Sequence, residues 1–353
     1  MHFCTQCSNM YYIRINADDP NKLVYYCRKC GHEDSLLASE NVCVSKTQIK
    51  KSEQSFNHII NKYMNITNKK ILVTGGAGFI GTNLIKQLKD RGMHVVSLDN
   101  YSTGNKLNEI EGVDYLDMDI EEILKIKETN FEVCFHLAAQ SRVQPSFDNP
   151  HESVRVNVTG TTRVMEWAKN NNVKVIYAGS SSKHHDPSDS PYAMTKFLGE
   201  EICNLYKKSF DVNVEIARFY NVYGPHEPLD EKFGNVIGIW QVKANNKKPL
   251  PIVGDGKQKR DFTHVKDIVD GLLRISNTEI KHHDAWEIGT GVNYSINQLY
   301  EMFKEKFDIN SVSIPDQRGN YRETLRVNDD LINLLNWKPK DRLKEYIANL
   351  NSK

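Results

Sequence analysis

The chain has 353 residues, a formal net charge of +1, and contents of 39% hydrophobic and 26% charged residues. Its length predicts two or three domains, and its composition is that of a folded protein rather than a disordered or fibrous one. The near-neutral charge gives no overall attraction to nucleic acid, and no apolar run approaches the roughly 20 residues of a membrane helix. Because the first residues also lack a signal-peptide pattern, we expect a soluble, cytoplasmic protein with no membrane partner.

Two Cys-x2-Cys pairs lie close to the N-terminus. Their members are Cys4, Cys7, Cys27 and Cys30. This spacing predicts a structural zinc site, because four thiolates fill a tetrahedral shell and leave no position for a substrate. Two disulfides are the alternative, which a cytoplasmic location disfavours. Residues 1–45 are too few to bury a core of their own, so we expect a metal-stabilised zinc ribbon there. Polar residues 46–68 then predict a linker that contains a short helix.

From residue 69 to residue 353, alternating strand-like and helix-like stretches predict an α/β fold of the Rossmann type, a doubly wound parallel sheet. We expect its strands near residues 70–74, 94–98, 113–117, 131–137, 173–179 and 212–219. The pattern then loosens, with helices expected near residues 235–245, 266–277 and 295–306 and a strand at 251–253. These shorter elements predict a smaller C-terminal substrate lobe, mainly from about residue 224 onward.

A glycine-rich turn, Thr74 to Gly81, follows the first strand of this region and precedes an amphipathic helix. Gly75 permits a tight turn, Gly78 lets backbone N–H groups approach a pyrophosphate, and Gly81 lets the helix pack against the strand. The second strand ends at Asp99, whose carboxylate can accept both ribose hydroxyls and would repel a 2′-phosphate. The pattern therefore predicts a dinucleotide site that prefers NAD to NADP.

Tyr192 and Lys196 lie one helical turn apart in a predicted helix and share one of its faces. An ammonium beside a phenol favours the phenolate, and the positive nicotinamide ring of NAD adds to this effect, so the tyrosine pKa should fall from about 10. We predict that Tyr192 is a general base tuned by Lys196. The preceding strand runs into a serine-rich turn, where Ser180 or Ser181 can hydrogen-bond a reacting oxygen. An ordinary surface pair and an ordinary turn are the alternatives.

Residues 69–345 resemble the extended short-chain dehydrogenase/reductase family, specifically its nucleotide-sugar epimerases and dehydratases. The resemblance is carried by the glycine turn, by the Tyr192/Lys196 pair and by further segments in the order typical of the family. These segments are Asp99–Gly104, Asp119–Ile120, His136–Gln140, Asn157–Thr161, Arg218–Pro225, Gly254–Gly256 and Arg260–Phe262. The resemblance implies an enzyme that binds NAD and a nucleotide-diphosphate sugar, and we expect it to be a homodimer.

The resemblance also implies roles for individual residues. The implied cofactor-binding residues are Gly75, Gly78, Phe79, Ile80, Gly81, Asp99, Asn100, Asp119, Ile120, Leu137, Ala138, Ala139, Asn157, Tyr192, Lys196 and Tyr220. Among these, Asp119 and Ile120 would flank the adenine. Asn157 would brace the site, and Tyr220 would lie near the nicotinamide. The implied contacts to the nucleotide diphosphate of the substrate are Asn221, Arg260 and Arg322.

Two departures from the family pattern bear on the reaction. The family usually has a Tyr-Gly pair after the serines, whereas this chain has Lys183 followed by His184 and His185, so the catalytic serine is either Ser180 or Ser181. Dehydratases of the family resemble one another in an Asp-Glu pair that supplies an acid and a base, and this chain lacks that pair. The histidines can shuttle protons, but we interpret them as loop residues. Epimerisation is therefore favoured.

We accordingly expect a nucleotide-sugar 4-epimerase, similar to UDP-glucose 4-epimerase, that oxidises C4 transiently. A dehydratase or reductase for the same class of substrate is the alternative. The first 45 residues resemble the N-terminal zinc ribbon of the small ninth subunit of eukaryotic-type RNA polymerase, without that subunit's second ribbon. This resemblance allows an interpretation of another class, a ribbon that binds a protein or a transcription complex with the Rossmann part as passenger. The intact Tyr192/Lys196 pair argues against it.

Overall fold

The computed structural model describes residues 3–15, 23–34, 70–128 and 130–351, and the chain divides into two compact units, Met1–Asn65 and Ile66–Lys353. The expected linker at residues 46–68 lies outside the described residues. Among the helices of the described ranges, none combines the length and the apolar character required to cross a membrane.

The smaller unit contains an antiparallel sheet of three strands, β1 (Tyr11–Ile15), β2 (Leu23–Cys27) and β3 (Glu33–Asp34). Its cluster of buried side chains is Cys4, Tyr11, Tyr25 and Cys27. The two tyrosine rings meet edge to face, with centroids 6.1 Å apart. So small a cluster buries little apolar surface.

The larger unit is built on a parallel sheet of seven strands in the order β13-β9-β8-β7-β4-β5-β6. The strands are β4 (Lys70–Thr74), β5 (His94–Asp99), β6 (Asp114–Asp117), β7 (Phe131–His136), β8 (Lys174–Ser180), β9 (Val214–Phe219) and β13 (Trp286–Ile288). The sequence predicts the first six, with ends that differ by a few residues at most. The chain leaves β4 for β5 on one side and later adds β7 on the other, so a ligand crevice is expected at the carboxyl ends of β4 and β7.

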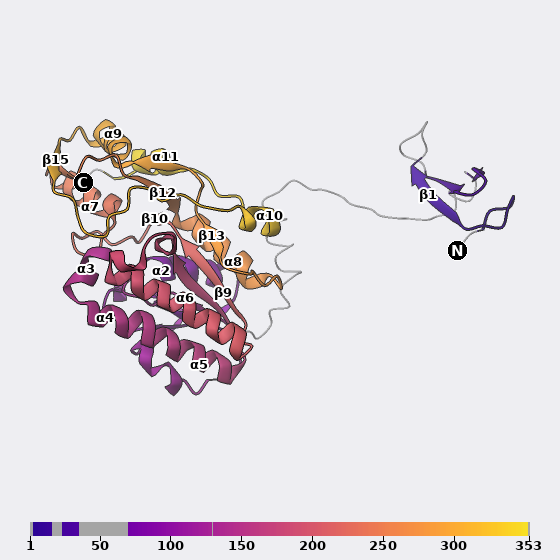
Figure 1. The fold of residues 1–353 in the computed structure, drawn as a ribbon, viewed down its shortest axis with the longest axis horizontal. Coiled ribbons are helices and arrows are strands. Elements are labelled where there is room, and N and C mark those ends of the chain that lie inside the picture. The colour runs from indigo at the N-terminus through magenta and orange to yellow at the C-terminus, as the bar shows by residue number, and fades with distance from the viewer. Residues whose placement is uncertain (1–2, 16–22, 35–69, 129, 352–353) are drawn as a thin grey trace. The chain divides into compact units, whose positions relative to one another are not determined.

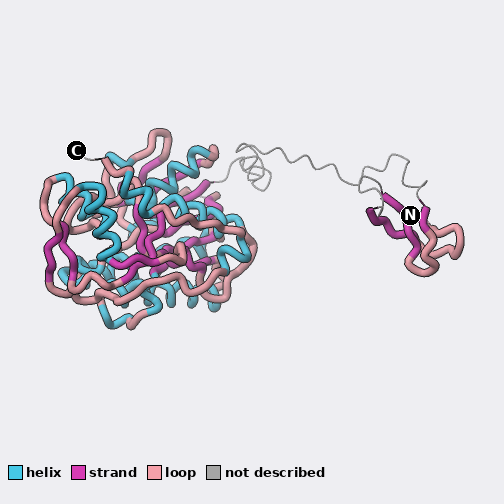
Figure 2. Tube along the Cα trace, turned by 90° about the horizontal axis from the view of Figure 1, so that it is seen from above, coloured by secondary structure: helices cyan, strands magenta, loops and turns pink. Residues whose placement is uncertain are grey.

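Helices enclose this sheet, as Figure 2 shows for the larger unit. Helix α2 (Phe79–Asp90) contacts α8 (Val265–Asn277), and α5 (Thr161–Asn171) contacts α6 (Pro191–Ser209). The strands bury apolar side chains against them, because both faces of a parallel sheet of this kind are covered. Two short helices, α3 (Val143–Asp148) and α4 (Pro150–Val154), follow β7.

Helix α6 begins at a well-formed cap. The Ser190 side chain accepts a hydrogen bond from the backbone N–H of Ala193 at 3.0 Å, and Pro191 occupies the first turn. Serine at the cap and proline in the first turn both favour a helix start at this point. The cap therefore fixes Tyr192 in the first turn of the helix, at the carboxyl end of the sheet.

The C-terminal elements gather at one end of the larger unit, away from α4 and α5 (Figure 1). They comprise a small sheet, β10 (Asn221–Tyr223), β12 (Lys259–His264) and β14 (Asn293–Ser295), and a parallel pair, β11 (Leu250–Val253) and β15 (Ser311–Ile314). The helices there are α7 (Val236–Asn245), α9 (Ile296–Phe307), α10 (Asp330–Leu335) and α11 (Leu343–Ala348). Buried residues of α7, α9 and α11, among them Trp240 and Phe303, form a core cluster of their own.

The sequence predicts β11, α7, α8 and α9 but not the other strands of this lobe. Strands β10, β12 and β14 are short, and β12 carries charged residues such as Arg260 and Asp261. Short strands without a run of alternating apolar residues give no period-2 signal, so their pairing depends on contacts distant in sequence.

Candidate active site

A single cavity with a volume of about 660 Å³ runs along the carboxyl ends of the sheet strands and under the C-terminal lobe. Its lining begins at the glycine turn after β4, continues past the end of β7 and the serine turn after β8, and includes the start of α6. It ends at residues of the lobe, among them Asn221 and Arg260. Most of the cofactor, catalytic and substrate residues predicted from the sequence therefore share one space, and the exceptions are Asp119, Asn157 and Arg322.

The glycine turn has the shape that a pyrophosphate needs. A side chain at Gly75 would lie 2.8 Å from the Ala138 backbone nitrogen, and one at Gly81 would lie 2.2 Å from the Gly75 carbonyl oxygen. Gly78 is the N-cap of α2 and provides no side-chain cap for its first turn, where Phe79 and Ile80 also line the cavity. Uncapped N–H groups at a helix N-terminus bind anions, so this site fits the diphosphate of a dinucleotide.

Asp99 lies at the end of β5, is 7% exposed and lines the cavity beside Asn100. Its carboxylate accepts hydrogen bonds from the backbone N–H groups of Ala77 at 2.9 Å and Tyr101 at 2.8 Å. Burial raises the pKa of this carboxyl group, which the two backbone hydrogen bonds partly oppose. The bonds hold the carboxylate against the glycine turn, where an adenosine ribose is expected.

The two residues implied for the adenine site differ in position. Ile120 lines the cavity, whereas the Asp119 side chain is bound by Arg155, with N–O distances of 2.8 and 3.0 Å, and by Asn100 at 2.9 Å. These contacts lower the pKa of Asp119, with the Arg155 hydrogen bonds as the main cause. The Asp119 carboxylate thus fixes Asn100 and the chain around Ile120 rather than facing the cavity.

Residues after β7 form the opposite wall. Leu137, Ala138 and Ala139 line the cavity. Asn157 is 1% exposed and does not line it. Its amide exchanges two hydrogen bonds with the backbone of Gln140, at 2.8 and 3.0 Å, and donates to Thr195 Oγ1 at 3.0 Å. Asn157 therefore joins the wall after β7 to helix α6.

Tyr192, Ser180 and Lys196 all line the cavity. Tyr192 Oη donates to Ser180 Oγ at 3.2 Å, and Ser182 Oγ donates to the same atom at 3.0 Å. Lys196 is 5% exposed, and its Nζ donates to the carbonyl oxygen of Ala178 at 2.5 Å. Ser181 also lines the cavity, but Ser180 is the serine that contacts the Tyr192 hydroxyl.

The pKa shifts in this centre follow mainly from burial. Burial raises the pKa of Tyr192, although the Ser180 hydrogen bond and the positive charge of Arg142 oppose it. Burial also lowers the pKa of Lys196 to about 8, with the charge of Glu200 acting in the opposite direction. The protein's own groups therefore do not lower the pKa of Tyr192 as predicted from the sequence. That prediction also depends on the positive charge of the nicotinamide ring.

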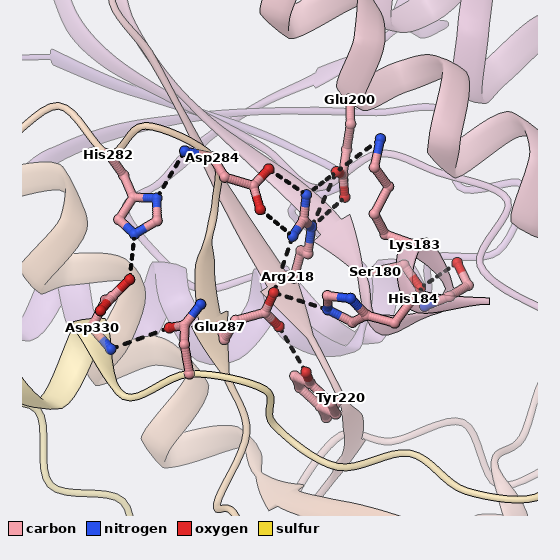
Figure 3. Close-up of polar contacts among 12 residues, drawn as sticks. Ser180, Lys183, His184, Glu200, Arg218, Tyr220, His282, Asp284, Glu287 and Asp330 are labelled. Atoms are coloured by element: carbon pink, nitrogen blue, oxygen red, sulfur yellow. Dashed lines mark hydrogen bonds and ion pairs between the residues drawn. The ribbon is translucent and has the colours of Figure 1, made fainter.

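Figure 3 shows a charged network behind the serine turn. Arg218 donates to Glu200, Asp284 and Glu287 at 2.7–3.2 Å. Glu287 also accepts from Tyr220 Oη at 2.7 Å and pairs with His184 Nε2 at 3.0 Å. Tyr220 lines the cavity, so Glu287 links a cavity residue to the end of the serine turn.

His184 and His185 are not free loop residues. His184 ends a 3₁₀ turn, Ser181–His184, and is bound to Glu287, while the His185 ring stacks on Tyr321 with centroids 3.8 Å apart. Both line a second cavity of about 370 Å³ on the other side of the turn. Their contacts hold the serine turn in place.

The residues implied for the substrate diphosphate separate into two groups. Asn221 and Arg260 line the cavity; Asn221 Nδ2 donates to Thr324 Oγ1 at 2.9 Å, and Arg260 Nη2 donates to Asn320 Oδ1 at 2.5 Å. The Arg322 side chain is 69% exposed, lies outside the cavity lining and forms an ion pair with Asp255 at 3.0 Å. The structure therefore does not bring Arg322 together with the other two.

Arg142, Phe233 and Tyr321 are among the lining residues that are absent from the sequence-based site. Arg142 lies two residues after the His136–Gln140 segment, and this position is the signal that could have pointed to it. Phe233 and Tyr321 lie in segments with no local pattern that marks them.

In the smaller unit, the sulfur atoms of Cys4, Cys7, Cys27 and Cys30 all lie within 4.8 Å of one another, and none forms a disulfide. The pairs Cys4–Cys30 and Cys7–Cys27 are 3.5 and 3.4 Å apart. Sulfur atoms around tetrahedral zinc are about 3.8 Å apart, given Zn–S bonds of about 2.3 Å. The donor set and its geometry fit a zinc ion.

Comparison with known protein families matches residues 71–289 to the NAD dependent epimerase/dehydratase family. The chain belongs to this family. It is 34% identical over 299 residues to a putative UDP-glucose 4-epimerase of Methanocaldococcus jannaschii, a match that covers 78% of this chain and 95% of that one. The family membership agrees with the Rossmann-type sheet described above.

Two solved structures extend the comparison. UDP-glucose 4-epimerase of Thermotoga maritima with UDP-glucose is 27% identical, with a TM-score of 0.75 over 80% of this chain and 97% of that one. UDP-glucuronic acid 4-epimerase of Bacillus cereus with UDP-glucuronic acid and NAD is 28% identical, with a TM-score of 0.72 over the same shares of the two chains. The family match begins after the four cysteines of the smaller unit.

Proposed function

We propose that the chain is an NAD-dependent nucleotide-sugar 4-epimerase that acts on UDP-linked sugars. The observation that carries this proposal is the Ser180–Tyr192 hydrogen bond beside buried Lys196, in the same cavity as the glycine turn. The similarity to UDP-sugar 4-epimerases over most of the chain supports the substrate class. We assign the cofactor as NAD because Asp99 lines the cavity at the end of β5, and a carboxylate there would repel a 2′-phosphate.

In this proposal Tyr192 Oη takes the proton of the C4 hydroxyl group, and Ser180 Oγ hydrogen-bonds the same oxygen. Bound NAD would supply acceptance of the hydride from C4 and its return to the opposite face of the resulting ketone. Tyr192 then gives back the proton. The Lys196 ammonium is held by the Ala178 carbonyl group at 2.5 Å. The reaction needs a dry pocket rather than a metal ion.

The alternative dehydratase reaction needs an acid and a base to eliminate water. Among the described residues that line the cavity, carboxylates are found only on Asp99 and Glu231. Asp99 lies at the glycine turn and Glu231 is paired with Lys243 at 2.7 Å, so neither faces the catalytic centre. Epimerisation therefore remains the better proposal.

Incubation of the purified protein with UDP-, GDP- and dTDP-linked sugars, followed by NMR of the products, tests the function. We expect a C4 epimer from a UDP-sugar, with no net consumption of NAD. A product that has lost water, a product that has gained two hydrogens, or the absence of any reaction across the whole panel would contradict the proposal.

We also propose that the smaller unit is a structural zinc ribbon. The four sulfur atoms within 4.8 Å of one another support this assignment. Because four thiolates leave no open position, the ion would stabilise the unit and take no part in the reaction. A protein or transcription-complex partner for the ribbon, a homodimer and a cytoplasmic location remain predictions from the sequence.

A further inference from the structure

Arg142 introduces a cation into the catalytic cavity without a matching anion. It immediately precedes α3, and its partly buried side chain lines the cavity together with Tyr192. Its Nε donates to the carbonyl oxygen of Phe233 at 2.6 Å. Neither of its Nη atoms has a hydrogen-bond or ion-pair partner in the described part of the chain. Withdrawing a guanidinium from water without an anion is unfavourable, so this edge of Arg142 is available to a ligand.

The two carboxylates whose negative charges act most strongly on Arg142 already accept hydrogen bonds from other groups. Glu227 accepts from Asn235 Nδ2 at 2.8 Å and from Tyr346 Oη at 3.0 Å, and burial raises its pKa to about 7. Asp230 accepts from two backbone N–H groups of its own loop at 2.9 and 2.6 Å. Neither carboxylate forms an ion pair with Arg142, so the loop before α7 leaves the charge unpaired.

The other cations that line the cavity are Lys196, Arg260 and Lys232, and Lys232 is exposed with its ammonium group over the Phe233 ring, 5.2 Å from the centroid. Lys196 is held by the carbonyl oxygen of Ala178, and Arg260 is hydrogen-bonded to Asn320 in the C-terminal lobe, where the substrate diphosphate is expected. Arg142 instead acts electrostatically on Tyr192, the proposed base for the C4 hydroxyl group. An anion that binds Arg142 while the C4 hydroxyl group meets Tyr192 must therefore belong to the sugar. The ring neighbours of C4 in a hexose are C3 and C5, and the carboxylate that belongs to the hexose carbon chain itself is C6, which is attached to C5.

We propose that Arg142 binds the C6 carboxylate of the substrate, so that the enzyme epimerises nucleotide-linked hexuronic acids in preference to neutral hexoses. This inference rests on the proposed 4-epimerase function. The planar Nη edge of an arginine anchored through Nε can pair with both oxygens of a carboxylate, a geometry that neither lysine nor an amide reproduces. A neutral hydroxymethyl group would leave the guanidinium without its counter-charge.

The test compares UDP-glucuronate with UDP-glucose on the full chain saturated with NAD. Binding is measured by calorimetry and turnover by NMR, for the wild type, Arg142→Gln, Arg142→Lys and a control, Arg163→Gln, which removes an exposed arginine on α5. We expect the wild type to prefer UDP-glucuronate. Arg142→Gln should weaken UDP-glucuronate binding by roughly 100-fold, because one partner of a desolvated charge pair is lost. UDP-glucose binding should change less than about threefold, and Arg142→Lys should be intermediate, since it keeps the charge but loses the fork.

The outcomes distinguish this inference from the proposed function. A wild type that prefers UDP-glucose overturns it, whatever the variants do. Equal weakening of UDP-glucuronate, UDP-glucose and UDP by Arg142→Gln also overturns it, because Arg142 would then bind the diphosphate. If neither sugar is epimerised but UDP-glucuronate is bound selectively and only through Arg142, the carboxylate assignment holds and the 4-epimerase proposal fails.

Discussion

Tyr192, the proposed catalytic base, shows how burial and charge compete at a single residue. Burial raises the pKa of Tyr192, and the groups of the described chain that oppose it are Ser180 and Arg142. Lys196, which the sequence analysis names as the tuning residue, is turned to the carbonyl oxygen of Ala178. A phenolate at neutral pH therefore needs a further positive charge, and the oxidised nicotinamide ring is the group that would provide it. Proton transfer by Tyr192 is in this way coupled to the presence of the cofactor.

The first prediction concerns the phenolic oxygen. Tyr192→Phe should lower kcat by about 10²–10⁴-fold, because a positioned general base contributes a factor of this size. The affinity for NAD should stay nearly unchanged, since the ring remains and only the hydroxyl group is lost. Stopped assays of epimerisation and calorimetry with NAD measure the two effects. Near-normal turnover of the variant would mean that the active site lies elsewhere.

The second prediction separates the two candidate serines. Ser180 Oγ contacts Tyr192 Oη at 3.2 Å, whereas Ser181 has no such contact in the described chain. Ser180→Ala should therefore lower kcat by at least about 10-fold, as expected for the loss of a hydrogen bond to the reacting oxygen, and Ser181→Ala should have a smaller effect. The two matched variants are compared under identical conditions. A larger loss for Ser181→Ala would reassign the role.

The third prediction concerns the choice of cofactor. We expect the wild type to bind NAD at least about 10-fold more tightly than NADP, because a 2′-phosphate would lie beside the buried carboxylate of Asp99. Asp99→Asn removes the charge with little change of volume, so the ratio of the two affinities should move toward one. Calorimetric titration of both proteins with both cofactors gives the ratio. Equal affinities in the wild type would contradict the assignment.

At the scale of elements, the sequence predicts the sheet far better than the lobe. Five of the six strands from β4 to β9 are largely buried, and the alternation of apolar runs with helical stretches is a local signal strong enough to place them; the exception is β6, an edge strand with the sequence Asp-Tyr-Leu-Asp. Strand β13 is only Trp286–Ile288 and contains Glu287, whose partners lie far away in sequence. No local pattern reveals it. The exposed position of Arg322 likewise depends on its ion pair with Asp255, and this pair forms only in the folded lobe.

The Glu287 network explains how a short strand positions the site. Glu287 is bound by Arg218 on β9, by Tyr220 and by His184 at the end of the serine turn (Figure 3). Burial alone would raise the pKa of Glu287, but the contacts with His184, Tyr220 and Arg218 outweigh it and the net pKa is lowered. The ionised carboxylate therefore holds the serine turn and the edge of the cavity together.

The fourth prediction follows from the sign of that shift. A carboxyl group with a lowered pKa in the folded state stabilises it above the unfolded value of 4.5, and this stabilisation is lost as the pH falls through the lower folded value. Glu287→Gln should lower the free energy of unfolding by about 3 kcal/mol at pH 7, because Arg218 loses one partner of a buried charge network. The difference from the wild type should shrink below pH 4.5.

Urea denaturation of both proteins between pH 3 and 7 measures this difference. Glu201→Gln is a matched control, because Glu201 pairs with Lys183 and its side chain is 48% exposed. The loss of this surface pair should change the free energy of unfolding by less than about 1 kcal/mol. A difference between Glu287→Gln and the wild type that stays constant with pH would show that the carboxylate charge is not the source of the effect.

At the scale of the whole molecule, the chain joins two units with different sources of stability. The larger unit buries extensive apolar surface between the sheet and its helices, whereas the core cluster of the smaller unit comprises only Cys4, Tyr11, Tyr25 and Cys27. The matched family region lies wholly within the larger unit. Catalysis and cofactor binding should therefore depend on one unit, and metal binding on the other.

The fifth prediction is that one zinc ion binds per chain, through Cys4, Cys7, Cys27 and Cys30, without affecting catalysis. Structural zinc binding supplies folding free energy, so removal of the ion by a chelator should unfold the smaller unit alone. Cys27→Ser should lose zinc by elemental analysis while NAD binding and turnover stay within about twofold of the wild type. A chain that begins near Asn68 should behave in the same way, because every predicted catalytic residue follows that point. If zinc content instead tracks activity across these variants, or the shortened chain is insoluble, the ribbon is part of the catalytic fold or of its assembly.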